Sequence, residues 1–308
     1  MRLLRNNDYG GFSLTDLHGN NVPPYAILSH TWGLDADEVS FEDVGNYADA
    51  LSVLAKPGYI KLQFCARRVA QDGLQYFWVD TACINKQSDR ELSEAINFMY
   101  HWYQRAARCY VYLSDVVASD GWEKFRQSRW FTRGWTLQEL LAPRRVDFYD
   151  ANGKHLGDKH TIAEQISYAT KIPHGALTDQ PLHNFSVEER LTWAQHRRTK
   201  REEDGAYSLL GIFDVSMPLV YGEGKDKAQY LPSEDLPDVG KALGTELAPT
   251  IRMADSTLSS SDAKGKQMEQ NWDADRKEWI QMHWSSEYNR HYRKQYVGDS
   301  WVFLDWVV

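Results

Sequence analysis

The chain has 308 residues, of which 42% are hydrophobic and 25% charged, a composition that excludes disorder throughout. Its 35 Lys and Arg against 43 Asp and Glu give a formal net charge of −8, which argues against a basic surface covering the molecule and against nucleic acid as a partner. At about 100–200 residues per domain, the length allows one large or two modest domains.

The three cysteines, Cys65, Cys83 and Cys109, form no C-x-x-C pair and no even disulfide framework, which is typical of a reducing compartment. The first residues, MRLLRNNDYGGFSL, contain no apolar region long enough for a signal peptide. No stretch approaches the ~18 apolar residues of a membrane span, and the histidines show no metal-binding spacing. We therefore expect a cytoplasmic protein, with the nucleus as the alternative location, and neither a membrane span nor a metal site.

Short apolar segments alternate with helical patterns in the N-terminal half. Residues 25–30 form a compact apolar run after a Pro-Pro pair, which predicts a buried strand. Apolar positions recur at helical spacing over residues 59–70, which predicts an amphipathic helix. A second strand is predicted over residues 76–80. Ser88 and Glu91 have the spacing of a capping box, which predicts a helix after them.

The same alternation continues to residue 149. Residues 109–114 predict a third strand, residues 135–141 a short helix closed by Pro143, and residues 146–149 a fourth strand. Strands that alternate with helices are joined by right-handed crossovers, so they predict an α/β fold with a doubly wound parallel sheet. The order of the strands stays open, because local patterns do not encode it.

Polar side chains follow the predicted strands at the points where the strands end. In a doubly wound sheet ligands bind outside the carboxyl ends of the strands, so these side chains are candidates for a binding site. Each of them also occupies a position from which it can cap the following helix, which is the alternative interpretation. The candidates are Ser29, His30, Trp32, Asp80, Cys83 and Ser114.

The segment that leads into the third predicted helix carries a distinctive set of residues. It contains Arg129 and Arg133, and Trp135 and Glu139 are i,i+4 neighbours on one helix face. Packing beside an indole can raise the pKa of a carboxyl group and shield a developing cation. The alternative is a surface Glu139 that pairs with Arg133 or Arg144.

Three segments resemble the signature blocks of the fungal heterokaryon incompatibility (HET) domain. They are YAILSHTWG at residues 25–33, WVDTACINKQ at residues 78–87 and RGWTLQE at residues 133–139. The resemblance covers about residues 20–150, and residues 188–222 are similar to the sequence that often follows the domain in fungal members. Membership implies a role in self/non-self recognition and regulated cell death.

The HET domain is in turn similar, more distantly, to TIR domains, which implies a TIR- or flavodoxin-like parallel sheet. Residues 27–29 lie where a TIR domain has its first strand, and WTLQEL at residues 135–140 resembles a TIR pattern of Trp, Cys, two residues, Glu and Leu. In catalytic TIR domains that Glu is required to cleave NAD between nicotinamide and ribose, and the matching residue is Glu139. Thr136 departs from the pattern, because TIR domains usually have Cys there.

The resemblance implies that NAD is a substrate, that no cofactor is needed and that Glu139 is catalytic. Loss of nicotinamide leaves an oxocarbenium-like ribosyl centre that a carboxylate stabilises, and nicotinamide leaves as a neutral molecule without a general acid. Trp32 and Trp135 are candidates for stacking on a ring of NAD, and Arg129 and Arg133 for contacting its pyrophosphate. The expected substrate-binding residues are Ser29, His30, Trp32, Asp80, Cys83, Arg133 and Trp135.

Two other classes of function fit the same residues. A hydrolase would use Cys83 as nucleophile, His30 as base and Asp80 as orienting group, since all three are predicted at one edge of the sheet. A non-enzymatic module would signal by assembly, and consumption of NAD by purified protein distinguishes the NAD-cleaving enzyme from such a module. The expected protein partners are further copies of the chain or a separate sensor protein.

The sequence predicts four regions. Residues 1–150 form the α/β domain, and residues 151–229 form a mainly helical extension that packs on it. The charge run at residues 197–204 is either a solvated face or an intermolecular contact. Residues 230–266, rich in Ser, Asp, Pro and Gly, predict a linker or loose loop, and residues 267–308 form an aromatic-rich tail.

The tail changes in character along its length. Aromatic residues between residues 269 and 296 predict a helix with an aromatic stripe, and residues 301–308 predict a short strand. A segment of about 40 residues with few aliphatic side chains is marginal as an independent domain. The tail is therefore expected to cover apolar surface of the domain or to dock a partner.

Overall fold

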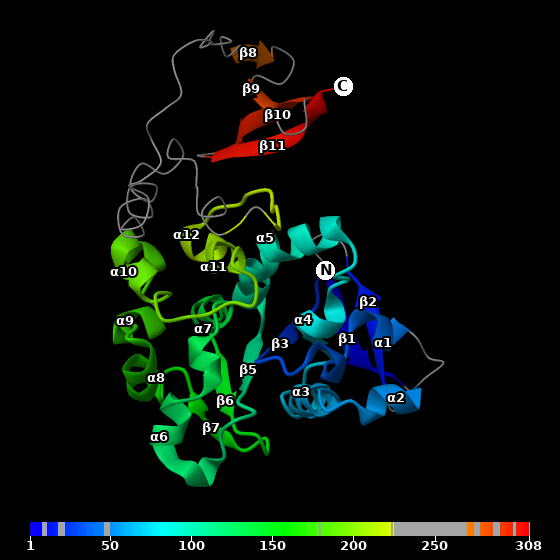
Figure 1. Cartoon of the computed structure of the whole chain (residues 1–308), viewed down its shortest axis with the longest axis vertical. Coiled ribbons are helices and arrows are strands. Elements are labelled where there is room, and N and C mark those ends of the chain that lie inside the picture. Colours follow the sequence, from blue (N-terminus) through cyan, green and yellow to red (C-terminus); the bar gives the residue numbers. More distant parts are fainter. Residues whose placement is uncertain are drawn as a thin grey trace. The chain divides into compact units, whose positions relative to one another are not determined.

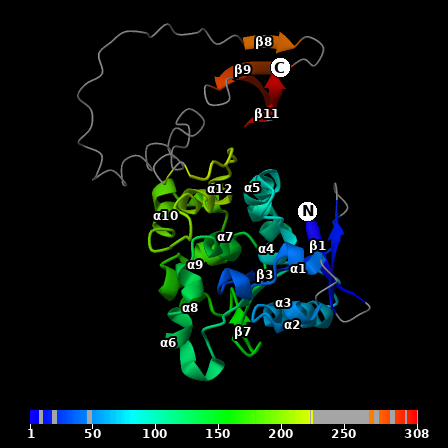
Figure 2. The ribbon, with the colours of Figure 1, turned by 45° about the vertical axis from the view of Figure 1, so that its right-hand side comes forward.

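The computed structural model describes residues 1–7, 11–17, 22–45, 50–178, 180–222, 224, 270–273, 278–285, 290–297 and 300–307. The chain divides into two compact units, Met1–Pro249 and Thr250–Val308. Figure 1 and Figure 2 show the ribbon from two directions. The predicted linker over residues 230–266 lies outside the described residues.

A seven-stranded sheet forms the centre of the first unit, in the order β2-β1-β4-β3-β5-β6-β7 (Figure 1). The central strands β4, β3, β5 and β6 are parallel, and they are the four strands predicted from the sequence. In chain order these strands lie 2-1-3-4, as in flavodoxin-like sheets, so the predicted doubly wound α/β fold is confirmed. The strands are β1 (Arg2–Asn6), β2 (Phe12–Asp16), β3 (Tyr25–His30), β4 (Tyr76–Trp78), β5 (Arg108–Tyr112), β6 (Val146–Tyr149) and β7 (His155–Asp158).

The edges of the sheet differ from the prediction of a purely parallel sheet. The hairpin of β1 and β2 is added beside β4 by antiparallel pairing, and β7 is added antiparallel to β6. The second predicted strand is also shorter than expected, since Val79 caps a short helix that begins at Asp80. The edge strands are short and only partly buried, so they lack the continuous apolar run that identifies a central parallel strand.

Helices cover both faces of the sheet. The chain moves from β3 outward to β4 and then back past β3 to β5, so right-handed crossovers place α3 and α5 on opposite faces. No helix in the described part of the chain is long and apolar enough to span a membrane. The α-helices are α1 (Phe41–Gly45), α2 (Ala50–Ala55), α3 (Tyr59–Gln71), α4 (Asp80–Cys83), α5 (Asp89–Arg105), α6 (Gly121–Arg126), α7 (Thr136–Leu141), α8 (Ala163–Thr170), α9 (His174–Leu177), α10 (Val187–Thr192), α11 (Asp204–Tyr207) and α12 (Leu210–Phe213). Short 3-10 helices are η1 (Asp35–Asp37), η3 (Ala118–Asp120), η4 (Arg129–Thr132) and η5 (Leu182–Asn184).

The start of α5 is held by a local hydrogen bond and by contacts with residues outside the helix. The Ser88 side chain accepts a hydrogen bond from the backbone N–H of Glu91, which is one half of the predicted capping box, whereas the Glu91 carboxylate bonds to other groups than the Ser88 N–H. The Glu91 carboxylate accepts from the backbone N–H of Asn85 at 2.9 Å and from Nη2 of Arg2 at 2.7 Å. Because Arg2 belongs to β1, the predicted helix start also holds the edge hairpin against α5.

The residues after β6 share the core of the sheet. Trp193, Ile212 and Phe213 are buried in the same hydrophobic cluster as the central strands. A smaller cluster joins Ile96 of α5 to Tyr207 and Leu210. The described part of the region 151–229 is mainly helical, with β7 as its strand. The helices that follow β6 are therefore part of one packed unit with the sheet.

The second unit contains an antiparallel sheet of four described strands in the order β11-β10-β9-β8. The prediction of a helix over residues 269–296 is wrong, and the predicted strand near residue 301 is confirmed as β11. The aromatic residues in this region favour strands, and their unequal spacing distributes them over three strands instead of one helix. The strands are β8 (Gln270–Asp273), β9 (Glu278–Ser285), β10 (Arg290–Val297) and β11 (Ser300–Val307).

Candidate functional site

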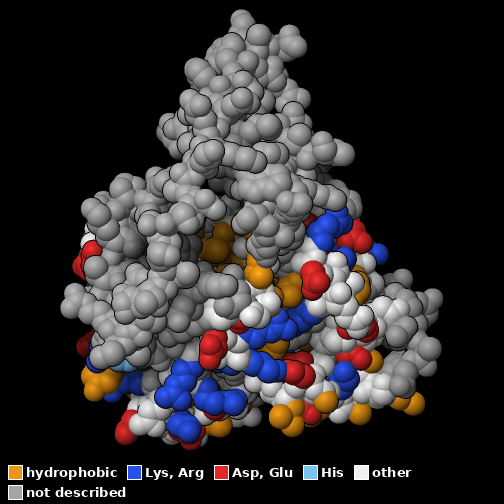
Figure 3. Space-filling model, turned by 45° about the horizontal axis from the view of Figure 1, so that its top comes forward, with side chains coloured by type: hydrophobic (Ala, Val, Ile, Leu, Met, Phe, Trp, Pro, Cys, Tyr) orange, Lys and Arg blue, Asp and Glu red, His pale blue; other side chains and the backbone are white. Residues whose placement is uncertain are grey.

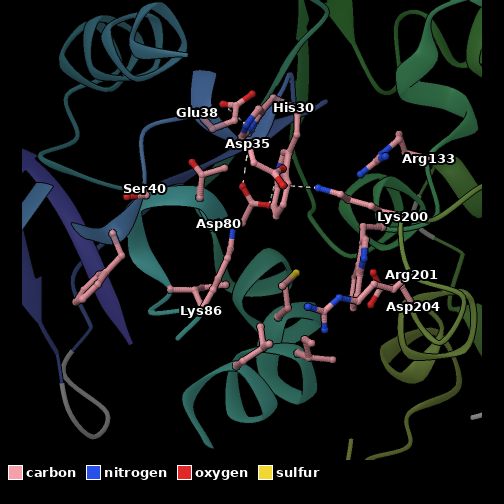
Figure 4. Close-up of a pocket in the computed structure, with 18 of the residues that line it drawn as sticks. His30, Asp35, Glu38, Ser40, Asp80, Lys86, Arg133, Lys200, Arg201 and Asp204 are labelled. Atoms are coloured by element: carbon pink, nitrogen blue, oxygen red, sulfur yellow. Dashed lines mark hydrogen bonds and ion pairs between the residues drawn. The ribbon is translucent and has the colours of Figure 1, made fainter. Parts of the chain in front are cut away.

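A cavity of about 600 Å³ lies at the carboxyl ends of β3 and β4. Its volume is within the range of ligand pockets, and its position is the one at which doubly wound sheets bind ligands. Its lining side chains, most of which are drawn in Figure 4, come from several elements of the first unit. They are His30, Trp32, Asp35, Glu38, Ser40, Phe41, Glu42, Asp80, Thr81, Ile84, Lys86, Leu92, Ile96, Met99, Arg133, Trp135, Thr136, Glu139, Lys200, Arg201, Asp204 and Tyr221.

The cavity brings together most of the site residues that the sequence predicts. Ser29 and Cys83 lie close by but do not line the cavity, and neither do Ser114 and Arg129. The predicted residues that line it are His30, Trp32, Asp80, Arg133, Trp135 and Glu139.

Glu139 lies on the short helix α7, and only 6% of its surface is exposed. Burial and the nearby Asp80 carboxylate raise the pKa of Glu139 to about 8, although hydrogen bonds from Ser29 and Tyr103 and the charge of Arg133 act in the opposite direction. The surface pairing of Glu139 with Arg133 or Arg144 is therefore not what the structure shows. A buried carboxyl group with a raised pKa at the edge of a pocket is typical of a functional residue.

Ser29 holds the Glu139 carboxyl group in position. The Ser29 hydroxyl donates a hydrogen bond to Oε2 of Glu139 and accepts one from the indole Nε1 of Trp130 at 2.7 Å. Ser29 and Trp130 are both fully buried. Ser29 was expected to bind substrate, but its position beneath Glu139 makes it a positioning residue. Trp130 was not predicted at the site, because its role depends on the packing of η4 against β3.

His30 lies between two carboxylates at the end of β3. Its Nε2 is 3.6 Å from Oε2 of Glu38, and its Nδ1 is 4.0 Å from Oδ1 of Asp80. Burial alone would raise the pKa of Glu38, but His30, the Lys61 ammonium group and the backbone N–H of Gly33 lower it to about 2. Glu38 is therefore a permanent negative charge in the wall of the pocket.

Trp32 and Asp80 are joined by a hydrogen bond of 2.8 Å from the indole Nε1 to Oδ2 of Asp80. The ammonium Nζ of Lys86 lies 3.7 Å from the centre of a Trp32 ring, which is the geometry of a cation–π contact. Lys86 was not among the predicted residues. The motif that contains it was recognised, but the approach of Lys86 to Trp32 depends on the folded loop after α4.

Four polar atoms of the cavity wall are buried without a hydrogen-bond partner in the described structure. Two of them, His30 Nε2 and Glu38 Oε2, face each other at 3.6 Å as an ion pair. Buried polar atoms are almost always hydrogen-bonded, so the other two, Asp80 Oδ1 and Thr81 Oγ1, point to a bound molecule or water. His30, Glu38 and Thr81 are each more than nine-tenths buried. The four atoms are His30 Nε2, Glu38 Oε2, Asp80 Oδ1 and Thr81 Oγ1.

Cys83 is unsuited to the nucleophilic role that one reading of the sequence gives it. It is buried in α4, its sulfur receives the backbone N–H of Val79 at 3.4 Å, and burial raises the pKa of its thiol to about 12. The thiolate is the nucleophilic form of cysteine, and such a pKa suppresses it at neutral pH. The structure therefore disfavours a hydrolase built on Cys83.

The two arginines before α7 have different surroundings. Arg129 is largely exposed and pairs with Asp115, its Nε lying 3.6 Å from Oδ2, so it does not face the cavity as expected. Arg133 lines the cavity, and its guanidinium has no hydrogen bond or ion pair within the described part of the chain. Arg133 is thus the predicted arginine that is available to a ligand.

One wall of the cavity comes from residues that sequence reasoning treated as a charged surface. Lys200, Arg201 and Asp204 all line it, together with Tyr221, whose hydroxyl donates to Oδ1 of Asp204 at 2.9 Å. Lys200 also pairs with Asp35 across the cavity (Figure 4). Residues 197–204 were predicted to be either a solvated face or an intermolecular contact, and neither prediction places them in the wall of a cavity. The signal available in the sequence was that this run lies within residues 188–222, which resemble the sequence that often follows the HET domain.

Backbone contacts attach this wall to the segment before α7. The N–H of Arg198 donates to the carbonyl of Thr132 at 2.7 Å, and the N–H of Gly134 donates to the carbonyl of Arg198 at 2.9 Å. A Cβ atom on Gly134 would lie 2.4 Å from Cγ2 of Thr199, so the missing side chain of Gly134 permits this close approach. Arg197 adds hydrogen bonds from Nη1 to the carbonyl of Arg133 and to Thr136.

The chemistry of the site is that of a pocket for a polar organic molecule. Its lining combines apolar side chains, among them Ile84, Leu92, Ile96 and Met99, with carboxyl groups, basic side chains and aromatic rings. No cluster of His, Cys, Asp and Glu suited to a metal ion occurs among the residues that the structure describes. The three cysteines are free and buried.

Comparisons with known proteins confirm the resemblance seen in the sequence blocks. Residues 25–122 match the family described as Heterokaryon incompatibility protein (HET). The chain is also similar to Vegetative incompatibility protein HET-E-1 of Podospora anserina, with 51% identity over 237 residues, or 74% of this chain. The match spans only 17% of that relative's length, and no solved structure matches the chain. These findings relate residues 25–122 to the fungal heterokaryon incompatibility (HET) family.

Proposed function

We propose that this chain is an effector of fungal self/non-self recognition and regulated cell death that cleaves NAD between nicotinamide and ribose. The similarity to a vegetative incompatibility protein supports the cellular role. The observation that carries the enzymatic part is the carboxyl group of Glu139, buried at the edge of a ligand-sized cavity and held there by Ser29. The distant likeness to TIR domains supplies the expected reaction.

The reaction needs few groups from the protein. The bond between the ribose carbon and the pyridinium nitrogen breaks, and its electron pair leaves with neutral nicotinamide. Water then adds to the ribosyl cation and loses a proton, giving ADP-ribose, so no cofactor is required. The Glu139 carboxylate stabilises the ribosyl cation by charge and by hydrogen bonds to ribose hydroxyls.

The raised pKa of Glu139 is compatible with this role. At neutral pH the carboxyl group is largely protonated, since burial raises its pKa to about 8. A ligand that carries a positive charge favours the ionised form of a nearby carboxyl group. Binding of NAD would therefore ionise Glu139 where the cation develops, and the buried carboxylate would have little water to screen its charge.

The partners and the location of this activity follow the same proposal. NAD is the small-molecule substrate, and the activating partner is a further copy of the chain or a separate sensor protein. We place the activity in the cytoplasm. An activity that depends on association would be low in dilute protein and higher when the chains are concentrated, which an assay can resolve.

The test is release of free nicotinamide from NAD by the purified chain, both dilute and under conditions that force association. Glu139→Gln keeps the shape of the side chain and removes its charge, so the rate should fall by roughly 10²–10³-fold, the effect of losing about 3–4 kcal/mol of transition-state stabilisation. The matched control is Glu164→Gln on the exposed face of α8, which should keep the wild-type rate.

Two outcomes would contradict the proposal. Wild-type protein that releases no nicotinamide in either condition would favour signalling by assembly without catalysis. A Glu139→Gln variant that keeps the wild-type rate per folded molecule would show that Glu139 is only structural. Circular dichroism of both variants separates loss of activity from loss of folding.

A further inference from the structure

Most charges that line the pocket fall into two halves, apart from Lys86 on the acidic side and Asp204 beside Arg201, while Lys200 and Asp35 pair with each other. We define the acidic half as Glu38, Glu42 and Asp80, and the basic half as Arg133 and Arg201. Figure 4 shows Glu38 and Asp80 on one side of the cavity and Arg133 and Arg201 on the other. A pocket with this separation orients a ligand that itself carries charges of opposite sign at its two ends.

The acidic half already holds a cation on an aromatic face. Lys86 places its ammonium group 3.7 Å from the centre of a Trp32 ring, and the indole of Trp32 is fixed by its hydrogen bond to Asp80. The second carboxylate oxygen of Asp80 and the hydroxyl of Thr81 are buried without hydrogen-bond partners in the described structure. This half therefore offers a ring face for a planar cation and two polar atoms for hydrogen-bonding groups at the edge of that cation.

The basic half has guanidinium groups that nearby carboxyl groups only partly neutralise. Arg133 has no hydrogen bond or ion pair to its guanidinium within the described residues, and Arg201 lies over the ring of Tyr221 at 4.2 Å. Asp204 lies in this half too, but its carboxyl group accepts a hydrogen bond from Tyr221 and forms no ion pair with Arg201 among the described contacts, and burial raises the pKa of Glu139 to about 8. Guanidinium groups bind phosphate through paired hydrogen bonds, so this half suits a phosphate anion.

We infer that the pocket binds a dipolar ligand in one orientation, with a planar cationic ring on Trp32 in the acidic half and phosphate on Arg133 and Arg201 in the basic half. Lys86 occupies the Trp32 ring in the structure, so it competes with the ligand's ring and must be displaced from it. The inference rests on the proposed function, because NAD has a pyridinium ring and a pyrophosphate. Beyond the proposed function, the inference states which residues bind the pyridinium ring of NAD and which bind its pyrophosphate.

Two fragments of such a ligand test the inference on the full chain by calorimetry. The N-methylnicotinamide cation carries the ring without phosphate, and ADP-ribose carries the phosphates without the cationic ring. Arg133→Gln should weaken ADP-ribose binding by about 10- to 100-fold, the range for a lost charged hydrogen bond, and change binding of the cation by less than about twofold. Arg201→Gln should change binding in the same direction.

Lys86→Met should strengthen the binding of the N-methylnicotinamide cation, whereas most substitutions in a binding pocket weaken binding. It removes the competing ammonium group and a positive charge from the acidic half, so binding of the N-methylnicotinamide cation should become about 2- to 10-fold tighter. Arg129→Gln is the control for the loss of a positive charge, because Arg129 is exposed, pairs with Asp115 and does not line the cavity. It should leave the binding of both fragments unchanged.

Each result decides between the inference and its failure. Equal weakening of both fragments by Arg133→Gln, or weaker binding of the cation by Lys86→Met, would overturn the inference. The predicted pattern in a chain that releases no nicotinamide from NAD would support the inference and contradict the proposed reaction. NAD cleavage with the same KM in wild type and Arg133→Gln would support the proposed reaction and overturn the inference.

Discussion

Glu139 couples the candidate site to the stability of the fold. Its carboxyl group is buried, with Ser29 donating to it and Asp80 close enough to oppose its ionisation. Burial of a carboxylate is unfavourable, and because the charge of Arg133 offsets this only in part, the raised pKa of Glu139 expresses a preference for the protonated form. Because of this preference, the free energy of unfolding should decrease as the pH rises.

The folded protein should lose stability as the pH rises from about 4.5 to about 8. In that window the unfolded chain has released the proton of Glu139 while the folded chain keeps it, so a rise in pH favours unfolding. The contribution of this single group has a slope of up to about 1.4 kcal/mol per pH unit. Urea unfolding of wild type and Glu139→Gln at several pH values isolates it. The variant should gain stability relative to wild type as the pH increases, and a constant difference would show that the folded carboxyl group is already ionised.

The segment 197–204 acts as an element of the site although it contains little regular structure. Its backbone bonds to Thr132 and Gly134 place Lys200 and Arg201 in the cavity wall. The close approach depends on the missing side chain of Gly134, where an added Cβ would meet Thr199. The geometry of this wall is therefore decided by one backbone contact between two distant parts of the chain.

Gly134→Ala should destabilise the protein by about 1–3 kcal/mol, because the added methyl group overpacks the contact with Thr199. Gly45→Ala is the matched control, since an added Cβ there meets no atom within 4 Å. Adding Thr199→Ser to Gly134→Ala removes the opposing methyl group and should recover most of the lost stability. The measurement is the free energy of unfolding in urea, and failure of the second change to restore it would contradict this explanation.

At the scale of the molecule, the pocket and the core both depend on residues beyond the predicted α/β domain of residues 1–150. Tyr207 and Leu210 pack on Ile96 of α5, and Trp193 belongs to the core of the sheet. These contacts show that the first unit is stabilised by packing between segments that are distant in sequence.

The surface in Figure 3 carries acidic, basic and hydrophobic side chains close together on the described part of the chain.

A chain truncated after residue 150 should therefore fail to fold cooperatively. It would expose the apolar face of α5 and lose the wall that contains Lys200 and Arg201. We expect strong binding of a hydrophobic dye and a broad, low-temperature unfolding transition, whereas a chain ending at residue 224 should unfold cooperatively. A sharp transition of the 1–150 chain at the temperature of the longer one would show that the α/β domain is independent.

Local patterns in the sequence were sufficient for the four parallel strands, for the helices α3, α5 and α7, and for six of the residues that line the cavity. The reason is that a buried strand or an amphipathic helix carries its signal in neighbouring residues, and the carboxyl ends of parallel strands meet at one edge. Aromatic residues in the tail were misleading, because their spacing is shared by a helix and by several short strands.

Tertiary structure alone decided the strand order, the antiparallel edges, the exclusion of the buried Ser29 and Cys83 from the cavity lining, and the wall formed by Lys200 and Arg201. These features depend on contacts between residues far apart in the chain, such as Trp130 with Ser29 and Arg198 with Gly134. A charge run looks the same in sequence whether it faces solvent or a pocket. Its role is set by what packs against it, and only the folded chain contains that information.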